Sequence, residues 1–589
     1  MTITEIPWLR LCLTHFALPD GHCQRQAAQP AQWLSALIVV LISGVACADK
    51  TDGLYDPERL LDIRIELPQR DWVELCGQTR NLVESLVSPP VDSPFEYFKG
   101  CVTINGTRID SVAVRKKGFL GSLDTKRPSL KLNLDKYVDG VEYCDVDNLT
   151  LNNCKQDQAL LSQWLTYRTY RRVGLPAPRL NLAKVTVNGK YLGIYANVEP
   201  VKSAFLRRNF GDSDGTLYEG TLADFTVGGI SRFERKNSDD APDDRVELRK
   251  TAEVLSAEPL DLHVLQQQID LEEFMKFWAV ESLVGFWDGY NNNQNNFFVY
   301  ANPTDGRLHF IPWGADVSFS KGVLSFLFKR GATQSVHARA RLPHLLYKTA
   351  ETRRQYFATL NQLLDTVWNE EELLAETDQV EKLVVDHLGE SQADSFHDAL
   401  KAVRRFIKTR RQEIANELSK GEPDAPNAGI PGSATVVGAV TAKFDGQWSQ
   451  QLSDDPIEVP IESLTIQVND AESLQLDNLS LAIGQKQQVS SPGIDPGSPR
   501  LLFKGQLTTD RTPVKLELTV TKKSFRTNNR FPVRIQGTLI EGREGFSLFN
   551  PPISRAACGT VEFDAASTVP GESVRGSLTL KLYDVSWGK

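Results

Sequence analysis

The chain has 589 residues, of which 41% are hydrophobic and 24% charged, and its formal net charge is −9. These ordinary globular values exclude wholesale disorder, collagen and coiled coil, and roughly 150 residues per domain predicts three or four domains. The acidic balance also argues against a protein whose main task is to coat nucleic acid, because that task normally needs a strongly basic face.

Residues 1–48 are predicted to be a leader. Residues 26–48 carry no charge, and the apolar run 33–42 is shorter than the ~20 residues that a spanning helix needs. Small residues follow, and Ala46-Cys47-Ala48 fits a signal-peptidase site. We therefore expect an extracytoplasmic protein that is secreted, periplasmic or associated with the cell envelope. Membrane attachment through a lipidated Cys47 and an uncleaved anchor are the alternatives.

The cysteines after the leader form no C-x-x-C pair, which argues against a zinc–thiolate site. In an oxidising compartment Cys76 with Cys101, and Cys144 with Cys154, are candidate disulfide pairs. Cys558 would then stay unpaired.

Residues 49–420 are predicted to form one domain that mixes strands and helices. Two hairpins are expected over 98–114 and 183–195, because Asn105-Gly106 and Asn188-Gly189 tolerate the positive φ of a tight turn.

The helices of this domain have recognisable ends. One is predicted over 158–173, with Gly174 as its stop. Another is predicted over 271–286, where Asp270 is the cap and Glu273 completes an acidic capping box. Two or three further amphipathic helices are expected in 341–419.

A strand at 130–134 presents a single cation. Its leucines face one side and Lys131 faces the other, behind the basic turn of Arg115, Lys117 and Gly118. An ATP-binding kinase places the lysine that contacts its α- and β-phosphates on such a strand, and Arg115 and Lys117 could add anion contacts. The alternative is a solvated lysine on an edge strand.

Two acids flank a predicted hairpin. A helix ends at Asp288, an Asn-rich loop leads into the hairpin 297–312, and Asp316 follows the returning strand. Phosphoryl transfer needs one carboxylate at the attacking hydroxyl, and an Asn with a second carboxylate at the metal ions. The alternative is a solvated loop whose acids cap turns, because Asn and Asp are enriched in loops.

The remaining chain is predicted to be a second domain. Pro and Gly punctuate residues 421–432, which is typical of a linker. Residues 433–589 contain period-two segments, such as 464–468 and 577–582, and therefore predict an antiparallel β domain.

These pieces, in this order, resemble the CotH kinase family, which is named after a spore coat protein. The resemblance spans roughly residues 63–319, and the helices up to about Lys420 would complete the domain. Its carriers are short segments: 115–118, 129–132, 151–153, 174–178, 187–195 with Glu199, 288–300 and 311–316. The implied fold class is α/β (α+β), an atypical protein-kinase-like fold followed by the C-terminal antiparallel β domain.

The resemblance implies an exported atypical kinase that moves the γ-phosphate of ATP, with Mg²⁺ or Mn²⁺, to Ser or Thr of a protein. By position, Lys131 resembles the ATP-phosphate lysine and Asp288 the catalytic aspartate, while Asp316 and Asn296, with Asn295 as a competitor, resemble metal ligands. Two further residues are placed with the ATP-binding group: Arg115 and Glu199. The expected partner is a Ser-rich envelope or secreted protein, and not nucleic acid.

Two departures from the family pattern leave an alternative open. Many members read Trp-Asp-x-Asp where this chain reads Trp313-Gly314-Ala315-Asp316, so one carboxylate is absent. The helix 158–173 holds no Glu to pair with Lys131, only Gln163. The alternative function is a catalytically inert, kinase-like protein for surface binding or adhesion.

Overall fold

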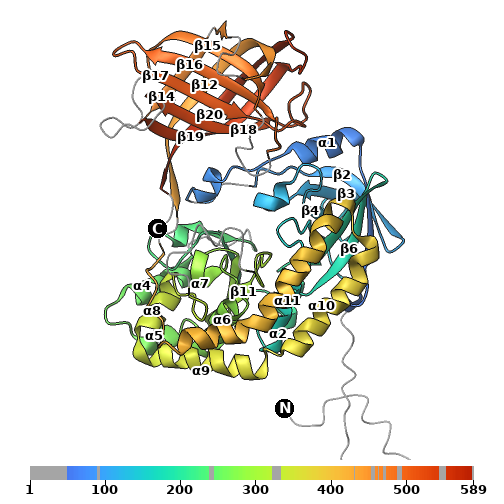
Figure 1. Cartoon of the computed structure of the whole chain (residues 1–589), viewed down its shortest axis with the longest axis vertical. Coiled ribbons are helices and arrows are strands. Elements are labelled where there is room, and N and C mark those ends of the chain that lie inside the picture. Colours follow the sequence, from blue (N-terminus) through green and yellow to red (C-terminus); the bar gives the residue numbers. More distant parts are fainter. Residues whose placement is uncertain are drawn as a thin grey trace, which may run out of the picture. The chain divides into compact units, whose positions relative to one another are not determined.

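The computed structural model describes residues 50–88, 90, 93–237, 245–320, 333–429, 432–452, 458–461, 463–468, 473–486, 494–542 and 552–586. The predicted leader and Cys47 lie outside these residues. The described part mixes helices with three β-sheets (Figure 1), which confirms the predicted α+β class with a C-terminal antiparallel sheet. Within it, no helix has the length and apolar character that crossing a membrane requires.

The first sheet has seven strands and closes on itself in the order β1-β2-β3-β4-β5-β7-β6. Its strands are β1 (Leu61–Glu66), β2 (Phe98–Ile104), β3 (Thr107–Lys116), β4 (Leu130–Asn133), β5 (Asn148–Asn152), β6 (Leu180–Val187) and β7 (Lys190–Val198). Both predicted hairpins are confirmed, as β2–β3 and β6–β7. Their turns have positive φ at both positions, 47° and 90° at Asn105-Gly106 and 49° and 75° at Asn188-Gly189.

Two helices belong to this part of the chain, α1 (Gln69–Gly77) and α2 (Ser162–Arg172). The predicted helix 158–173 starts later because the Asp157 carboxylate accepts the backbone N–H groups of Leu161 at 3.1 Å and Ser162 at 2.8 Å. These bonds satisfy amides that a helix start leaves open. Gly174 follows the helix with φ 80°, as its predicted stop.

The second sheet has the order β11-β10-β8-β9. Its strands are β8 (Thr216–Gly220), β9 (Phe233–Arg235), β10 (Phe297–Asn302) and β11 (Arg307–Pro312), and its helices are α3 (Ser203–Phe210), α4 (Val246–Ser256), α5 (Leu262–Gln266), α6 (Leu271–Leu283) and α7 (Tyr290–Asn293). Helix α6 is the predicted helix 271–286 and carries much of the core. Its cap Asp270 accepts the Glu273 N–H at 3.0 Å, but the Glu273 carboxylate bonds the buried His309 at 2.9 Å, away from the predicted capping box.

Four helices, more than the two or three predicted, follow in 341–418. They are α8 (Arg341–Lys348), α9 (Ala350–Thr366), α10 (Glu370–Val384) and α11 (Glu390–Leu418). Helix α9 packs on α6, where the Trp278 and Tyr356 rings lie 4.0 Å apart. Short 3₁₀ turns complete the described helical elements: η2 (Asp52–Leu54), η3 (Val83–Leu86), η4 (Leu120–Leu123), η5 (Ile230–Arg232) and η7 (Val385–His387).

The C-terminal sheet, drawn in orange to red in Figure 1, contains the predicted period-two strands. Its strands are β12 (Ser433–Gln451), β13 (Val459–Pro460), β14 (Ser463–Val468), β15 (Leu476–Gln485), β16 (Pro499–Leu507), β17 (Pro513–Thr519), β18 (Val533–Glu541), β19 (Ile553–Ala565) and β20 (Ser573–Ser586). All its pairings are antiparallel except a short parallel one between β12 and β15. The domain boundaries at 420 and 433 stay a prediction.

The candidate disulfides are absent, because Cys76, Cys101, Cys144 and Cys154 are all free thiols. Cys76 is buried at the end of α1, whereas the Cys101 sulfur lies on β2 and is bonded by the Arg108 guanidinium at 2.8 Å. Burial raises the pKa of the Cys76 thiol to about 11, so its thiolate is disfavoured.

Candidate functional site

Asp288, the predicted catalytic aspartate, lies just beyond α6 and is surrounded by the side-chain amides of three asparagines. Its Oδ1 accepts the side-chain N–H groups of Asn293 at 2.6 Å and Asn295 at 3.3 Å, and its Oδ2 accepts that of Asn296 at 2.8 Å. Burial raises the pKa of Asp288, and these three donors oppose the rise. The carboxylate is thus desolvated yet held in one orientation.

The Asn-rich run forms a helical turn, α7, and Glu281 holds it in place. The Glu281 carboxylate accepts the backbone N–H groups of Tyr290 at 3.0 Å and Asn291 at 2.9 Å, and the Asn291 side chain at 2.8 Å. A Cβ at Gly289 would lie 2.5 Å from Glu281 Oε1, so a side chain there would displace the Glu281 carboxylate. Sequence reasoning missed Glu281, although a single acid within the mostly apolar stretch 277–286 was a usable signal.

Asn293 was also missed. It follows Asp288 at the spacing D-x-x-x-x-N, which in protein kinases separates the catalytic Asp from a metal-binding Asn. Both Asn293 and Asn296 turn their amide nitrogens to Asp288, so their oxygens are directed away from it. Both oxygens are therefore candidate metal ligands.

Asp316 follows β11, whereas Asp288 precedes β10, so both acids lie beside the open end of the β10–β11 hairpin. Asn296 links them. The Asn296 carbonyl accepts the Trp313 N–H at 3.1 Å, while its side chain bonds Asp288. Burial raises the pKa of Asp316 to about 7, the negative charge of Asp288 adds to the rise, and Lys117 opposes it. The structure thus brings the two predicted acids into one half-buried site, where their charges interact.

Gly314, the position of the missing family carboxylate, has φ 54° and lies against Asn296. A Cβ there would be 2.6 Å from Asn296 Oδ1. The space that a side chain at 314 would need is therefore taken by Asn296.

Lys117 is the lysine whose charge acts on Asp316. It follows β3, donates to Asn152 Oδ1 at 3.3 Å, and lies 5.8 Å from the centre of the Trp313 ring. Burial lowers its pKa to about 8, against the opposing pull of Glu219 and Asp316. A buried ammonium with a lowered pKa gains from a new anionic partner, as a phosphate would be.

Lys131 lies on β4 directly opposite Arg115 on β3, with its side chain away from the buried leucines as predicted. Burial lowers the pKa of Lys131 to about 8, and Arg115, Lys202, Lys236 and Lys117 lower it further. Lys131 therefore belongs to a group of cations, and the charge of Lys117 acts both on Lys131 and on Asp316.

Glu219 offers the acid that helix α2 lacks. It is on β8, pairs with Lys236 at 2.6 Å, and is the acid that most strongly raises the pKa of Lys117. Gln163 of α2 instead accepts a hydrogen bond from the Asn152 side chain at 3.1 Å. Sequence spacing gave no signal for Glu219, because β8 comes from a distant part of the chain.

Glu199 is occupied by two arginines. Arg179 donates to Oε1 at 2.8 Å and Arg208 to Oε2 at 2.6 Å, and the Arg179 backbone N–H adds a bond at 2.9 Å. These partners lower the pKa of Glu199 in spite of its burial. The structure places Glu199 in this ion-pair cluster and does not join it to Lys131.

The donor set suits a hard divalent cation that is shared with phosphates. Asp316 receives no hydrogen bond from another side chain in the described residues, and its neighbours supply amide oxygens, which Mg²⁺ and Mn²⁺ accept. No group of three or more His, Cys, Asp or Glu side chains that could cage a metal occurs in the described ranges. Such a sparse site fits Mg²⁺, which binds through one or two carboxylates plus substrate phosphates.

The sequence was also compared with those of known proteins. The sequence model of the family described as "CotH kinase protein" matches residues 114–414. "Inner spore coat protein H" of Bacillus subtilis (strain 168) is 20% identical over 288 residues, which cover 46% of this chain and 78% of that protein. "Spore coat protein homolog 1" of Rhizopus delemar is 22% identical over 182 residues, 29% of this chain and 30% of that protein. The chain therefore belongs to the CotH kinase protein family.

Proposed function

We propose that this chain is an atypical protein kinase that transfers the γ-phosphoryl group of ATP to a Ser or Thr hydroxyl. The observation that carries the proposal is the electrostatic coupling of Asp288 and Asp316 in one half-buried site, where the charge of Lys117 acts on Asp316. The low local dielectric strengthens the interactions of these groups with one another and with a bound phosphate. A site of this kind works by positioning and electrostatics, which is what phosphoryl transfer requires.

In this proposal Asp288 accepts the hydroxyl proton of the acceptor. Its raised pKa makes it a better base than an exposed aspartate, and the three amides keep it aimed. Asp316 and Asn296, with Asn293 as a competitor for the amide position, hold Mg²⁺ or Mn²⁺. Bound ATP supplies the phosphoryl group, and the metal ion neutralises charge on its phosphates.

The cations of the closed sheet bind the phosphates. Lys117 contacts them on the side of Asp316, and Lys131 and Arg115 extend the positive surface along β3 and β4. The Glu219 carboxylate, which pairs with Lys236, favours the charged form of Lys117. Glu199 does not contact ATP in this scheme. It follows β7 and, through Arg179 and Arg208, holds that strand end to the start of β6 and to α3.

The proposed acceptor is a Ser-rich envelope or secreted protein. Two observations support this location: the predicted leader, whose residues 26–48 carry no charge and end in Ala46-Cys47-Ala48, and relatives whose names place them with spore coats. Attachment to a membrane through a lipidated Cys47 is part of the same proposal.

An inert, kinase-like binding protein is the second candidate. It is favoured by Gly314, which lacks the carboxylate that many family members carry, and by the Asn296 side chain that takes up the space there.

The two candidates differ in one assay. The purified full chain is incubated with γ-labelled ATP, Mg²⁺ or Mn²⁺ and a Ser-rich basic peptide. The kinase transfers label, and D288A and D316A abolish the transfer, whereas D398A, at an 86% exposed side chain on α11, leaves it unchanged. Absence of transfer together with absence of any nucleotide-induced rise in melting temperature would leave the binding protein.

A further inference from the structure

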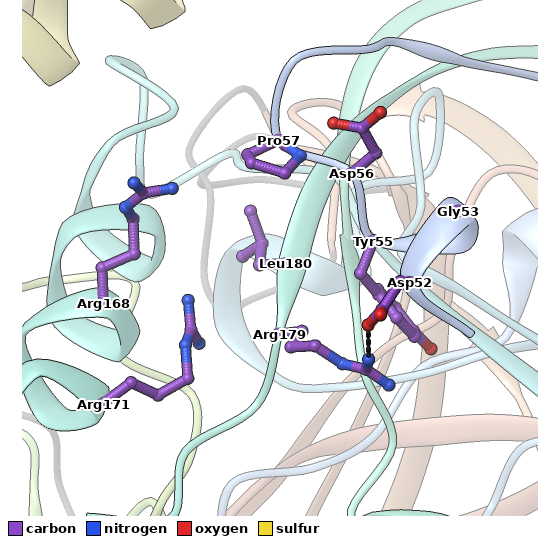
Figure 2. A pocket seen from close by; sticks show the side chains of 9 residues that line it. All are labelled: Asp52, Gly53, Tyr55, Asp56, Pro57, Arg168, Arg171, Arg179 and Leu180. Carbon is purple, nitrogen blue, oxygen red and sulfur yellow. Dashed lines mark hydrogen bonds and ion pairs between the residues drawn. The ribbon is translucent and has the colours of Figure 1, made fainter. Parts of the chain in front are cut away.

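A hollow of about 500 Å³ lies apart from the acid pair, between α2, the start of β6 and the 52–57 segment. Figure 2 shows Arg168 and Arg171 of α2 on one wall, and Asp52 and Asp56 across from them. Arg179 also lines the hollow, where its guanidinium is bonded to Asp52 at 2.7 Å. Three guanidinium groups thus border one small space.

Arg171 is the cation of this hollow that lacks a charged partner. Arg168 pairs with Glu376 at 2.8 Å, and Arg179 pairs with Asp52 and with Glu199. Arg171 donates to the Pro178 carbonyl, and in the described part of the chain no carboxylate lies within ion-pair distance of it. Burial lowers the pKa of Arg171 to about 10, and Arg168 lowers it further.

The hollow is separate from the proposed catalytic site. The first residue of α2, Ser162, donates to the Ser318 carbonyl two positions after Asp316. Arg171 lies near the other end of the helix, about 14 Å along its axis at 1.5 Å per residue. A cation in the last turn complements the helix dipole, which accounts for Arg171 alone but not for Arg168 beside it.

We propose that the Arg168–Arg171 wall binds a phosphoryl group, either free phosphate or a phosphorylated residue of a peptide. Guanidinium groups bind phosphate oxygens in a bidentate fork, and clustered arginines are the usual receptors of phosphorylated motifs. A dianion on this wall neutralises Arg171 and relieves its repulsion from Arg168. The aspartates opposite confine the anion to the arginine side. This site goes beyond the proposed transfer reaction and does not depend on it.

Titration calorimetry on the full chain tests the site. The D288A background separates binding from transfer. The probes are a phosphoserine peptide, the same peptide without phosphate, and inorganic phosphate. We expect the phosphopeptide to bind at least tenfold more tightly than its unphosphorylated form. R171Q should weaken this binding at least tenfold, whereas R511Q, at a 67% exposed side chain, should not change it.

A second variant and a competition experiment show which group binds the phosphate and which kind of ligand carries it. R171K keeps the charge but loses the fork, so an intermediate affinity is expected, and it replaces R171Q if that variant does not fold. Inorganic phosphate that competes at equal concentration identifies a small-anion site, and failure to compete identifies a peptide-borne phosphate. Equal binding of both peptides, or equal phosphopeptide affinity of R171Q, R171K and the parent, would overturn the proposal. Loss of label transfer alone would leave it standing.

Discussion

Replacing Lys117 by methionine separates the two lysines of the proposed nucleotide site. The charge of Asp316 acts on Lys117, whereas the charges that act on Lys131 are those of other cations. A hydrogen bond from a charged donor contributes about 1.5–3 kcal/mol, so loss of one contact between Lys117 and a phosphate should weaken MgATP binding about 10- to 150-fold. K131M should cost less, about threefold, because Arg115 and Lys202 still supply positive charge.

The fold should tolerate the Lys117 replacement. Lys117 is half-buried and desolvation lowers its pKa to about 8, so an apolar side chain of similar length removes that desolvation cost. The free energy of unfolding should therefore change by less than about 1 kcal/mol. A loss of nucleotide affinity can then be read as loss of a contact and not of the fold.

MgATP is titrated into the full-length parent and variants, and its affinity is measured by calorimetry. Urea unfolding of the same proteins measures the free energy of unfolding. K443M, at an exposed lysine of β12, is the matched control and should bind as the parent does. If K131M abolishes binding while K117M retains it, the reasoning that joins Lys117 to Asp316 is refuted.

Three further predictions concern single positions. G314A should lower the free energy of unfolding by about 1–2 kcal/mol in urea, because its φ is 54° and its Cβ would displace Asn296; unchanged stability would contradict this. E199Q should lower the free energy of unfolding by about 3–5 kcal/mol, because it removes the buried carboxylate that Arg179 and Arg208 share, and MgATP affinity should stay unchanged; weaker binding at unchanged stability would instead support an ATP-contacting role. Burial raises the pKa of Glu281 to about 8, so the folded state keeps a proton that the unfolded chain loses near pH 4.5. The free energy of unfolding should therefore fall by up to about 1.4 kcal/mol per pH unit as the pH rises from 5 to 8. E281Q should flatten that profile, and equal slopes for parent and variant would show that another group is responsible.

The fold was readable from the sequence wherever a local signal had one structural meaning. Asn105-Gly106 and Asn188-Gly189 specify their hairpins because few other residues adopt two successive positive φ values. The alternating pattern of β20 specifies a half-buried strand in the same local way. The helices after residue 341 were undercounted, because short breaks such as the one between Lys348 and Ala350 interrupt the chain without changing its apolar period.

The candidate site was readable only in part. Asp288 precedes and Asp316 follows the β10–β11 hairpin, and the pairing of its strands brings the two acids together, so their proximity could be predicted from the sequence. Lys117 follows a strand of the first sheet and Glu219 lies on a strand of the second, and no spacing along the chain encodes the interaction of their charges. The same limit applies to Cys76 and Cys101, which are near in sequence but lie on different elements with different partners.

Crystals of the full chain grown with Mn²⁺ and a non-hydrolysable ATP analogue would test the central claim most directly. The account predicts an anomalous Mn²⁺ peak about 2.0–2.2 Å from Asp316, with the analogue's phosphates against Lys117 and its γ-phosphate facing Asp288. Metal and nucleotide bound elsewhere in the chain, with Asp288 and Asp316 unligated, would contradict it.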